Sequence, residues 1–277
     1  MNKSYVPVLT IAGSDPSGGA GIQADLKTFS ALGCYGMSVI TALTAQNTQG
    51  VQSVLPVDAF FVNEQLDSIF QDIQIAAVKT GMLHNKNIIH AITHFFQTQT
   101  YFNSYYLIVD PVLTATNGGV LLEANAIDTL RQNLLPIASL ITPNIPEAEI
   151  LIGQSIKNQT QMETAAKQLV AMGCQAVLLK GGHLEKGESN DCFFSVEKNE
   201  VVWLNATRID TGNTHGTGCT LSAAITALVG QGMSLLDAIK LGKTYLHRAI
   251  SEGASYKLGK GQGPVHHFYH VWKNYHI

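Results

Sequence analysis

The sequence predicts one α/β domain, a three-layer sandwich with a mostly parallel central sheet, helices on both faces and a small antiparallel hairpin at one sheet edge. Three observations predict this fold. Short β-rich segments alternate with longer helical segments along the 277 residues. Several strand segments are apolar on both parities, as expected for strands covered on both faces. No linker, internal repeat or low-complexity stretch interrupts the pattern, so residues 1–277 are expected to form a single domain.

The candidate strands are short apolar runs at residues 6–11, 36–43, 76–79, 105–109, 140–142 and 176–179. The candidate helices lie between and after them, at residues 22–32, 59–70, 87–96, 126–134, 161–172, 220–229 and 235–252. In the helix at 161–172, Ala165, Leu169 and Met172 recur at helical spacing, and Gly173 follows as the expected C-cap. Strands that alternate with helices imply parallel strands joined by right-handed crossovers. Ligands of such sheets bind beyond the carboxyl ends of the strands.

One region breaks the alternation. Residues 192–196 and 201–207 are predicted to form a β-hairpin around Lys198-Asn199. This hairpin would add antiparallel strands at one edge of the sheet.

Composition and charge exclude several classes of protein. Hydrophobic residues make up 45% of the chain and charged residues 13%, which allows a large core and disfavours disorder. The formal charge of −3 and the pI near 6.3 lack the basic excess that nucleic acids and anionic membranes attract. No apolar run is long enough to span a bilayer, and the first one continues into Ser14-Asp15 without a signal-peptide cleavage pattern. The four cysteines form no CxxC pair, which disfavours a zinc site or a disulfide framework and favours a cytoplasmic protein.

A glycine-rich turn at residues 210–219 (DTGNTHGTGC, the C-terminal glycine turn) opens an Ala/Leu-rich helix. Its glycines let backbone amides turn inward, and the helix N-terminus adds partial positive charge. Gly216, Thr217, Gly218 and Cys219 would therefore cradle a phosphoryl group, and the same field would lower the pKa of the Cys219 thiol. Taken alone, such a turn is more often a plain helix entry with a buried cysteine. It lacks the Lys-Ser/Thr of a Walker A loop, and it does not follow the first strand as a Rossmann fingerprint would.

A second glycine-rich stretch (residues 13–21, the N-terminal glycine turn) follows the first strand. Three glycines in four positions permit close approach of the backbone to a ligand. Asp25 falls about one turn inside the next helix. It is either a pocket residue or an exposed first-turn carboxylate favoured by the helix dipole.

These segments, with others, resemble the hydroxymethylpyrimidine/phosphomethylpyrimidine kinases of thiamine biosynthesis, which are ribokinase-like. The similar segments cover essentially the whole chain, in order. They are GSDPSGGAGIQADLKT (13–28), SVITALTAQNT (38–48), VKTGML (78–83), DPV (110–112), TPNIPEA (142–148), LKGGH (179–183), NTHGTGCTLS (213–222) and GQGPVHHF (261–268). The resemblance implies a ribokinase-like three-layer sandwich, ATP and Mg²⁺ as cofactors, and a homodimer. It also implies phosphorylation of 4-amino-5-hydroxymethyl-2-methylpyrimidine to the monophosphate and then to the diphosphate.

The resemblance implies that Cys219 is the catalytic base, at a position where many ribokinase-like enzymes carry aspartate. A free thiol has a pKa of about 8.5, and a helix N-terminus could bring it near neutrality. Only the first phosphorylation would need this base, because the acceptor of the second is a phosphate oxygen that is already ionised. His215 is the weaker candidate base, since the family places the chemistry on the last residue of the turn.

Five residues are expected to bind the pyrimidine. Gln46 offers a donor and an acceptor side by side, which match the ring nitrogen and exocyclic amine of an aminopyrimidine, although without the resemblance it would be a polar residue capping a strand end. Asp25 resembles a pocket carboxylate. Met82 would form an apolar wall of the ring slot, unless it only fills the core. Ala20 and Val112 are expected to line the pocket.

The phosphate end is expected to hold Mg²⁺ and ATP. Asp110 closes an apolar strand, and with Glu147 it would hold the metal partly through water. Asn144 and Glu147 form an Asn-x-x-Glu element similar to the family's phosphate organiser, and Glu147 is also placed to be a first-turn helix carboxylate. Lys180 would reach the ATP phosphates as a point charge, and Thr217 would donate to the same oxygens.

One stretch departs from the family pattern, because Thr116 stands where a lysine is common. Three alternatives remain open. The first is a pyridoxal kinase, also ribokinase-like. The second is a non-catalytic pyrimidine-binding sensor, and the third, the least favoured, is a cysteine hydrolase.

Overall fold

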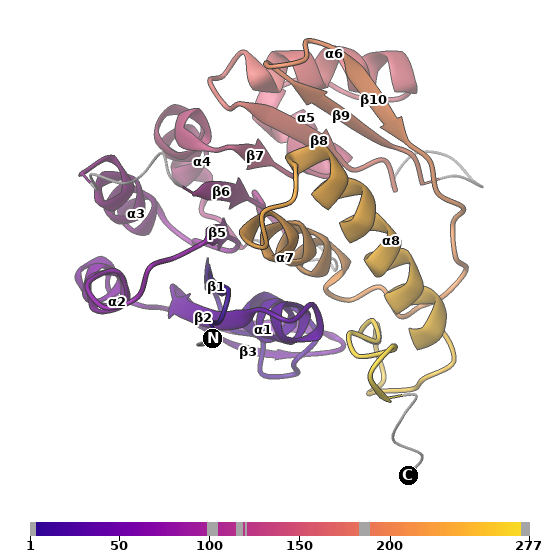
Figure 1. Cartoon of the computed structure of the whole chain (residues 1–277), viewed down its shortest axis with the longest axis horizontal. Coiled ribbons are helices and arrows are strands. Elements are labelled where there is room, and N and C mark those ends of the chain that lie inside the picture. The colour runs from indigo at the N-terminus through magenta and orange to yellow at the C-terminus, as the bar shows by residue number, and fades with distance from the viewer. Residues whose placement is uncertain (1–3, 99–104, 115–118, 120, 183–188, 273–277) are drawn as a thin grey trace.

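The computed structural model describes residues 4–98, 105–114, 119, 121–182 and 189–272. Its centre is an eight-stranded sheet in the order β10-β9-β8-β7-β6-β5-β1-β2 (Figure 1). The strands are β1 Pro7–Ala12, β2 Tyr35–Ile40, β5 Ala77–Thr80, β6 Tyr106–Val109, β7 Leu140–Ile141, β8 Ala176–Leu179, β9 Asp191–Ser195 and β10 Val201–Leu204. Strands β2, β1 and β5 to β8 pair in parallel, whereas β9 and β10 are antiparallel. The three-layer fold and the antiparallel edge hairpin are therefore confirmed.

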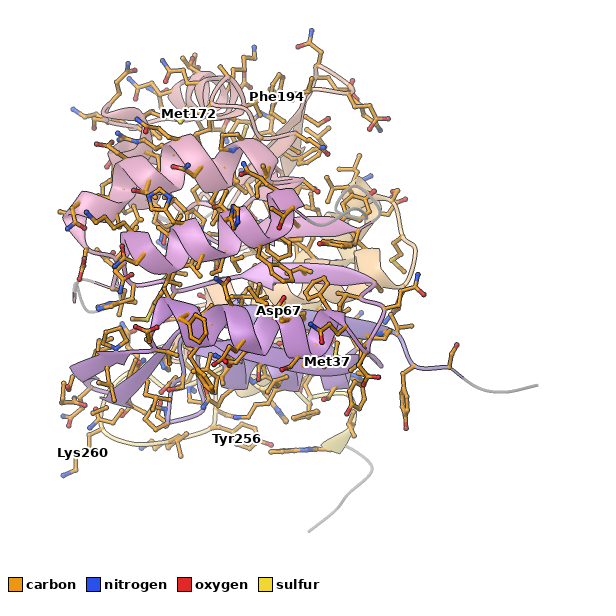
Figure 2. The ribbon with its side chains drawn as sticks, turned by 90° about the vertical axis from the view of Figure 1, so that its left-hand side faces the viewer. Met37, Asp67, Met172, Phe194, Tyr256 and Lys260 are labelled. Carbon is orange, nitrogen blue, oxygen red and sulfur yellow. The ribbon has the colours of Figure 1, made fainter. Side chains whose placement is uncertain are left out.

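Helices cover both faces of the sheet, and the side-chain alternation of β1 shows why. Leu9 and Ile11 enter one core with the helical layer α2 Ala59–Phe70, α3 Lys86–Thr98, α5 Ile145–Ile152 and α6 Gln159–Val170. Val8 enters the opposite core with α1 Gly21–Ala31, α7 Thr217–Gly230 and α8 Leu235–Gly253. Because the sheet is buried on both faces, its strands are apolar at consecutive positions. Figure 2 shows the first helical layer, with Asp67 on α2 and Met172 just after α6.

The strand predicted at 36–43 is wrong in its extent. The chain leaves the sheet at Thr41, and residues Ala42–Asn47 form β3, which pairs antiparallel with β4 Gly50–Pro56 in a separate two-stranded sheet. We call this sheet the β3–β4 flap. Backbone bonds from Thr41 to Ala12 and from Val57 to Thr41 fix the point of departure. The flap is not evident from the sequence, because the apolar run continues across the bend.

Three local predictions also need correction. The helix expected at 126–134 begins as a 3₁₀ turn at Ala124–Ala126, continues as α4 Ile127–Thr129, and ends in a π-helical turn at Leu130–Leu134. Helix α5 was not predicted as an element. Helix α6 ends at Val170 with Ala171 as its C-cap, so Gly173 (φ +114°) lies in the following turn and is not the cap.

Candidate active site

A cavity of about 650 Å³ lies at the carboxyl ends of the parallel strands. Its walls include residues that end or directly follow four of them, β1, β5, β6 and β8, which is where parallel sheets place their ligands. Both glycine turns and the β3–β4 flap complete the wall. The predicted site residues that line it are Ala20, Gln46, Met82, Asp110, Val112, Asn144, Glu147, Lys180, Gly216, Thr217, Gly218 and Cys219.

Helix α7 presents its N-terminus to this cavity. Its N-cap is Gly216, whose φ of +78° favours glycine. A Cβ on Gly216 would lie 1.8 Å from the backbone oxygen of Gly19, so the two glycine turns touch each other here. The first-turn residues Thr217, Gly218 and Cys219 face the cavity. The amides of this first turn and the helix dipole make it a suitable place for a phosphoryl group, and the Thr217 amide also donates to the Thr214 carbonyl oxygen at 3.3 Å.

Asp15, which was not among the predicted site residues, organises the N-terminal glycine turn. Its carboxylate accepts hydrogen bonds from the Ser17 amide (2.9 Å) and hydroxyl (2.7 Å), and from the amides of Gly19 (3.1 Å) and Ala20 (2.8 Å). His215 Nε2 lies 2.8 Å from the same carboxylate. Burial opposes ionisation, but these donors, His215 first among them, lower the pKa of Asp15 to about 2. The signal in the sequence was an aspartate before a serine and glycines, typical of a side chain that caps its own turn.

Asp25 is the clearest correction at the site. Its side chain is fully buried and does not belong to the cavity wall. Lys79 Nζ donates to both carboxylate oxygens, at 2.7 and 2.8 Å, and Thr10 Oγ1 donates at 2.6 Å. The carboxylate points from α1 onto β1 and β5, so neither the exposed first-turn position nor direct contact with the cavity is observed. Lys79, which the sequence analysis did not select, does line the cavity.

Asp110, Lys180 and Glu147 form a charged cluster at the ends of β6 to β8. Lys180 Nζ donates to Asp110 Oδ1 at 3.0 Å, and Thr142 Oγ1 donates to the same oxygen at 3.0 Å. Burial disfavours the Asp110 carboxylate, but Lys180 and Lys79 hold its pKa below the ordinary value. Burial and the negative charge of Asp110 raise the pKa of Glu147 to about 7. The cluster therefore places two mutually repelling carboxyl groups, Asp110 and Glu147, beside one lysine.

Asn144 and Glu147 have a structural task as well. They form the capping box of α5, in which Asn144 Oδ1 accepts from the Glu147 amide and Glu147 Oε2 accepts from the Asn144 amide, both at 2.8 Å. Glu147 is only 4% exposed and still lines the cavity. Both readings of this residue, helix cap and cavity carboxylate, therefore describe its position.

The donor set of this cluster fits Mg²⁺. Two carboxylates facing one cavity offer the hard oxygen ligands that this ion takes, and a divalent cation would relieve the repulsion between them. Within the described ranges, no group of three or more His, Cys, Asp or Glu side chains is arranged to hold a metal. Few protein ligands and several waters are the usual environment of Mg²⁺.

The expected acidic thiol is not observed. Burial raises the pKa of Cys219 to about 11, and the neighbouring carboxylates Asp25 and Asp110 add to this, against the opposing charge of Lys79. The helix N-terminus was expected to lower this pKa, but desolvation of the thiolate is the larger effect here. The remaining cysteines, Cys34, Cys174 and Cys192, are buried.

Part of the cavity wall is apolar, and we call this part the apolar slot. Met82, Leu121 and Ala42 form a small core cluster there, with Val112 packed against it. Gln46 lines the cavity from a position within β3. The expectation that it follows the end of a strand is therefore wrong. A β-bulge between Ala45 and Gln46 shifts the strand register at this point. Bulges commonly re-aim a side chain in this way.

A third part of the wall had no sequence assignment. It combines residues after β10 with one face of α8: Thr207, Arg208, Ile209, Lys243, Leu246, His247 and Ile250. Lys243 Nζ donates to the Ser189 carbonyl oxygen at 2.8 Å and pairs with Asp191, whose other oxygen accepts from the Gly181 amide. These residues could not be predicted from the sequence, because they belong to ordinary helical and loop patterns.

Thr116 lies outside the described residues, as do His183 and His276. Of the C-terminal histidines, His267 is buried, and its Nε2 lies 3.1 Å from Thr220 Oγ1 behind the C-terminal glycine turn. Burial lowers the pKa of His267 to about 3. It therefore supports the helix α7 entry as a neutral side chain.

Comparisons with known proteins agree with this arrangement. Residues 15–266 match the phosphomethylpyrimidine kinase family. A hydroxymethylpyrimidine/phosphomethylpyrimidine kinase of Salmonella typhimurium is 50% identical over 268 residues, which are 96% of this chain and 98% of that protein. The thiamine biosynthesis bifunctional protein ThiED of Geobacter sulfurreducens is 47% identical over 260 residues, 94% of this chain and 52% of that protein. The structure of a Bacillus subtilis pyridoxal kinase in complex with ADP superimposes with a TM-score of 0.85 at 37% identity, covering 95% of this chain and 98% of that one.

Proposed function

The chain belongs to the phosphomethylpyrimidine kinase family, and from this premise we propose how its cavity works. The protein is a kinase of thiamine biosynthesis. It transfers the γ-phosphoryl group of ATP to 4-amino-5-hydroxymethyl-2-methylpyrimidine and then phosphorylates the monophosphate to the diphosphate. The observation that carries this proposal is the lining of one cavity. The apolar slot, the Gln46 amide, the lysine–carboxylate cluster and the N-terminus of α7 all contribute to its wall.

The pyrimidine ring is proposed to occupy the slot beside Met82, Val112 and Ala20. Gln46 would pair with the ring nitrogen and the exocyclic amine, because one amide supplies both a donor and an acceptor. Asp25 would act through Lys79 and not on the substrate directly. In this assignment Asp25 supports the site by holding Lys79 and does not contact the ligand.

The phosphates are proposed to lie against α7 and Lys180. A Cβ on Gly218 would lie 3.2 Å from Lys180 Nζ and 3.7 Å from Asp110 Oδ2, so the turn and the charged cluster are adjacent. Thr217 and the amides of the turn would donate to phosphate oxygens, and Asn144 would contribute from the start of α5. Asp110 and Glu147 would hold Mg²⁺. When bound, the ion supplies neutralisation of phosphate charge as the transfer proceeds.

Cys219 is proposed to serve the first phosphorylation alone. In that step the hydroxymethyl oxygen forms a bond to the γ-phosphorus, the bond between that phosphorus and the bridging oxygen of ADP breaks, and the hydroxyl proton goes to the thiolate. With a pKa of about 11, little thiolate exists near pH 7 in the free protein. Cations bound beside Asp110 would offset its negative charge, which is one cause of the raised pKa of Cys219. The second phosphorylation has an ionised acceptor and needs no base.

The deciding experiment is an ATP-consumption assay with Mg²⁺ that offers hydroxymethylpyrimidine, its monophosphate and pyridoxal separately. Turnover of both pyrimidines with little turnover of pyridoxal is the expected result. Turnover of pyridoxal alone would overturn the proposal. A Cys219→Ala variant should lose far more activity on the alcohol than on the monophosphate, whereas equal losses would remove the base assignment.

Pyridoxal phosphorylation is the second candidate, because the pyridoxal kinase structure superimposes over nearly the whole chain. Pyridoxal also carries a hydroxymethyl group on a six-membered ring, and the apolar slot would accept it. The ring edge decides between the two substrates, since Gln46 matches an aminopyrimidine edge better than it matches a pyridine edge. Tight pyrimidine binding without turnover would instead favour a sensor.

A homodimer is proposed on the outer face of the β3–β4 flap. Leu43 and Leu55 are paired across the flap and are 46% and 64% exposed, and Phe60 at the start of α2 is 71% exposed. Apolar side chains gathered in this way are typical of a protein interface. A second copy of the chain would cover them. Sedimentation equilibrium of the parent and of a Leu55→Lys variant tests this, with a shift to monomer expected in the variant.

The remaining expectations concern organisation and location. We propose that residues 1–277 act as one catalytic domain in the cytoplasm, with no nucleic-acid or membrane partner. In support, both cores share one central sheet. Among the residues that the structure describes, every helix is too short or too polar to cross a membrane.

A further inference from the structure

The C-terminal glycine turn contributes a side chain that the proposed chemistry does not use. His215 lines the cavity, and its Nε2 has two neighbours from distant parts of the chain. Asp15 Oδ2 lies 2.8 Å away, and Gln46 Nε2 lies 3.5 Å away. This histidine therefore connects the N-terminal glycine turn with the side chain proposed to recognise the pyrimidine.

The hydrogen on His215 can be located by its partners. A carboxylate only accepts hydrogen bonds, and Asp15 stays ionised because its pKa lies at about 2. At 2.8 Å an unprotonated Nε2 would place a lone pair against this charge. His215 therefore carries a hydrogen on Nε2 and donates it to Asp15. Toward Gln46, 3.5 Å away, this nitrogen offers an N–H group without a free lone pair, so it cannot accept from the amide NH₂.

The hydrogen on Thr44 can be located in the same way. Thr44 Oγ1 lies 2.8 Å from the Ser14 carbonyl oxygen, which can only accept, and 3.2 Å from Gln46 Oε1. The single hydroxyl hydrogen goes to the shorter bond with Ser14. Toward Gln46, Thr44 then offers a lone pair. Gln46 is thus placed between the N–H group of His215, which cannot accept a hydrogen bond, and an acceptor, Thr44.

These two neighbours determine how the amide must be turned. With Oε1 toward Thr44, two hydrogen-bond acceptors face each other. With Nε2 toward His215, two N–H groups face each other. A rotation of 180° about the last side-chain bond exchanges the two nearly isosteric ends. It converts the Thr44 contact into a hydrogen bond and replaces the donor–donor contact at His215 by an attractive contact between the amide oxygen and the N–H group. We propose that Gln46 works in this second orientation, with Oε1 toward His215 and its NH₂ group toward Thr44, and that Asp15, His215 and Thr44 are positioning residues that enforce it.

The orientation sets the order of acceptor and donor along the edge that Gln46 presents to the cavity. An aminopyrimidine can match that order in only one pose of its ring nitrogen and amine. The network would therefore fix which way the ring lies in the slot, and so where its hydroxymethyl group points. This inference rests on the proposed function for the identity of the substrate, but the orientation itself belongs to the protein alone.

The protein-level test is the tautomer of His215, observed by long-range ¹H–¹⁵N NMR on the full chain without substrate. A hydrogen on Nε2 is expected, and a hydrogen on Nδ1 alone would overturn the inference. This outcome does not depend on which substrate the enzyme uses. A failure of the proposed function would therefore be seen separately, in the turnover assay.

The functional test compares hydroxymethylpyrimidine with its analogue that lacks the 4-amino group. In His215→Phe and in Thr44→Val, KM for the aminopyrimidine should rise about two- to tenfold, the effect of one hydrogen bond, while kcat changes little. The preference over the deamino analogue should fall by a similar factor. His215→Gln retains a donor and should recover part of the loss.

Two controls separate positioning from general damage. Gln52→Ala alters an exposed side chain on β4, outside the cavity, and should leave both KM and the preference unchanged. The double variant His215→Phe/Thr44→Val should lose less than the product of the single losses, because both residues act through the same amide. Independent effects of the two residues, or equal losses on both substrates, would overturn the inference.

Discussion

Removing the positive charge of Lys79 should strongly destabilise the protein. The Lys79 and Asp25 side chains are both 0% exposed, and the ammonium contacts both carboxylate oxygens at 2.7 and 2.8 Å. Burial disfavours the ammonium, but Asp25, Cys219 and Asp110 together hold the pKa of Lys79 above its ordinary value. Lys79→Met would leave Asp25 as an uncompensated buried carboxylate. Loss of one partner of such a pair costs about 3–5 kcal/mol in the free energy of unfolding.

The pH dependence of the single variants should run in opposite directions. In Lys79→Met, burial raises the pKa of Asp25 above its unfolded value, so the folded state binds more protons and stability falls as pH rises above about 4. In Asp25→Asn, the lone ammonium has a lowered pKa, so the unfolded state binds more protons and stability rises toward about pH 10. Each slope is at most about 1.4 kcal/mol per pH unit.

Urea unfolding followed by circular dichroism at pH 5 and pH 9 measures these effects. The double variant Lys79→Met/Asp25→Asn should recover part of the loss, since it buries no unpaired charge. Asp128→Asn is the matched control, because it breaks a 3.0 Å ion pair whose aspartate is 77% exposed, and it should cost less than about 1 kcal/mol. Single variants that behave like this control, or that share one pH slope, would refute the reasoning.

Three further predictions concern the glycine turns and their support. The rate of alcohol phosphorylation should rise with pH from 7 to 10 because the pKa of Cys219 lies at about 11, while monophosphate phosphorylation should not, and a stopped-assay pH profile of each step checks this. Gly216→Ala should abolish activity, since its Cβ would lie 1.8 Å from the Gly19 oxygen, whereas Gly212→Ala, which has open space, should retain activity in the same assay. His267 has a folded pKa of about 3, below its unfolded value, so it adds stability above about pH 6.5 that is lost as pH falls. In urea unfolding, His267→Gln should flatten the decline between pH 6.5 and 4; an unchanged decline would contradict the assignment.

The alternating strand and helix segments predicted most of the fold because a sheet covered on both faces imposes apolar residues at consecutive positions. The same pattern predicted a wrong strand end near Thr41, because the apolar run continues across a bend there. The bend itself is marked by long-range backbone bonds of Thr41 with Ala12 and Val57, which the local sequence does not reveal. Helix α5 was hidden for a different reason. It is short, and its capping box is also a site motif.

The candidate site was predictable where a residue's position follows from the end of a strand. Asp110 and Lys180 directly follow β6 and β8, and both line the cavity as expected. Asp25 could not be placed this way, because helical spacing alone does not say whether its side chain turns toward solvent or toward β5. The protonation of Cys219 was missed because the helix dipole can be inferred from sequence, whereas the depth of burial that opposes it cannot.

The contact between the two glycine turns joins residues 200 positions apart in the chain, at Asp15 and His215. A ribosome must therefore synthesise most of the protein before the two glycine turns can meet, although the bonds within the N-terminal turn are local. The exposed residues 196–200 between β9 and β10 offer a place to divide the chain before that event. Two fragments separated there would each lack one of the turns, and activity would return only on their reassembly. The return of activity would then report the reassembly of the two fragments.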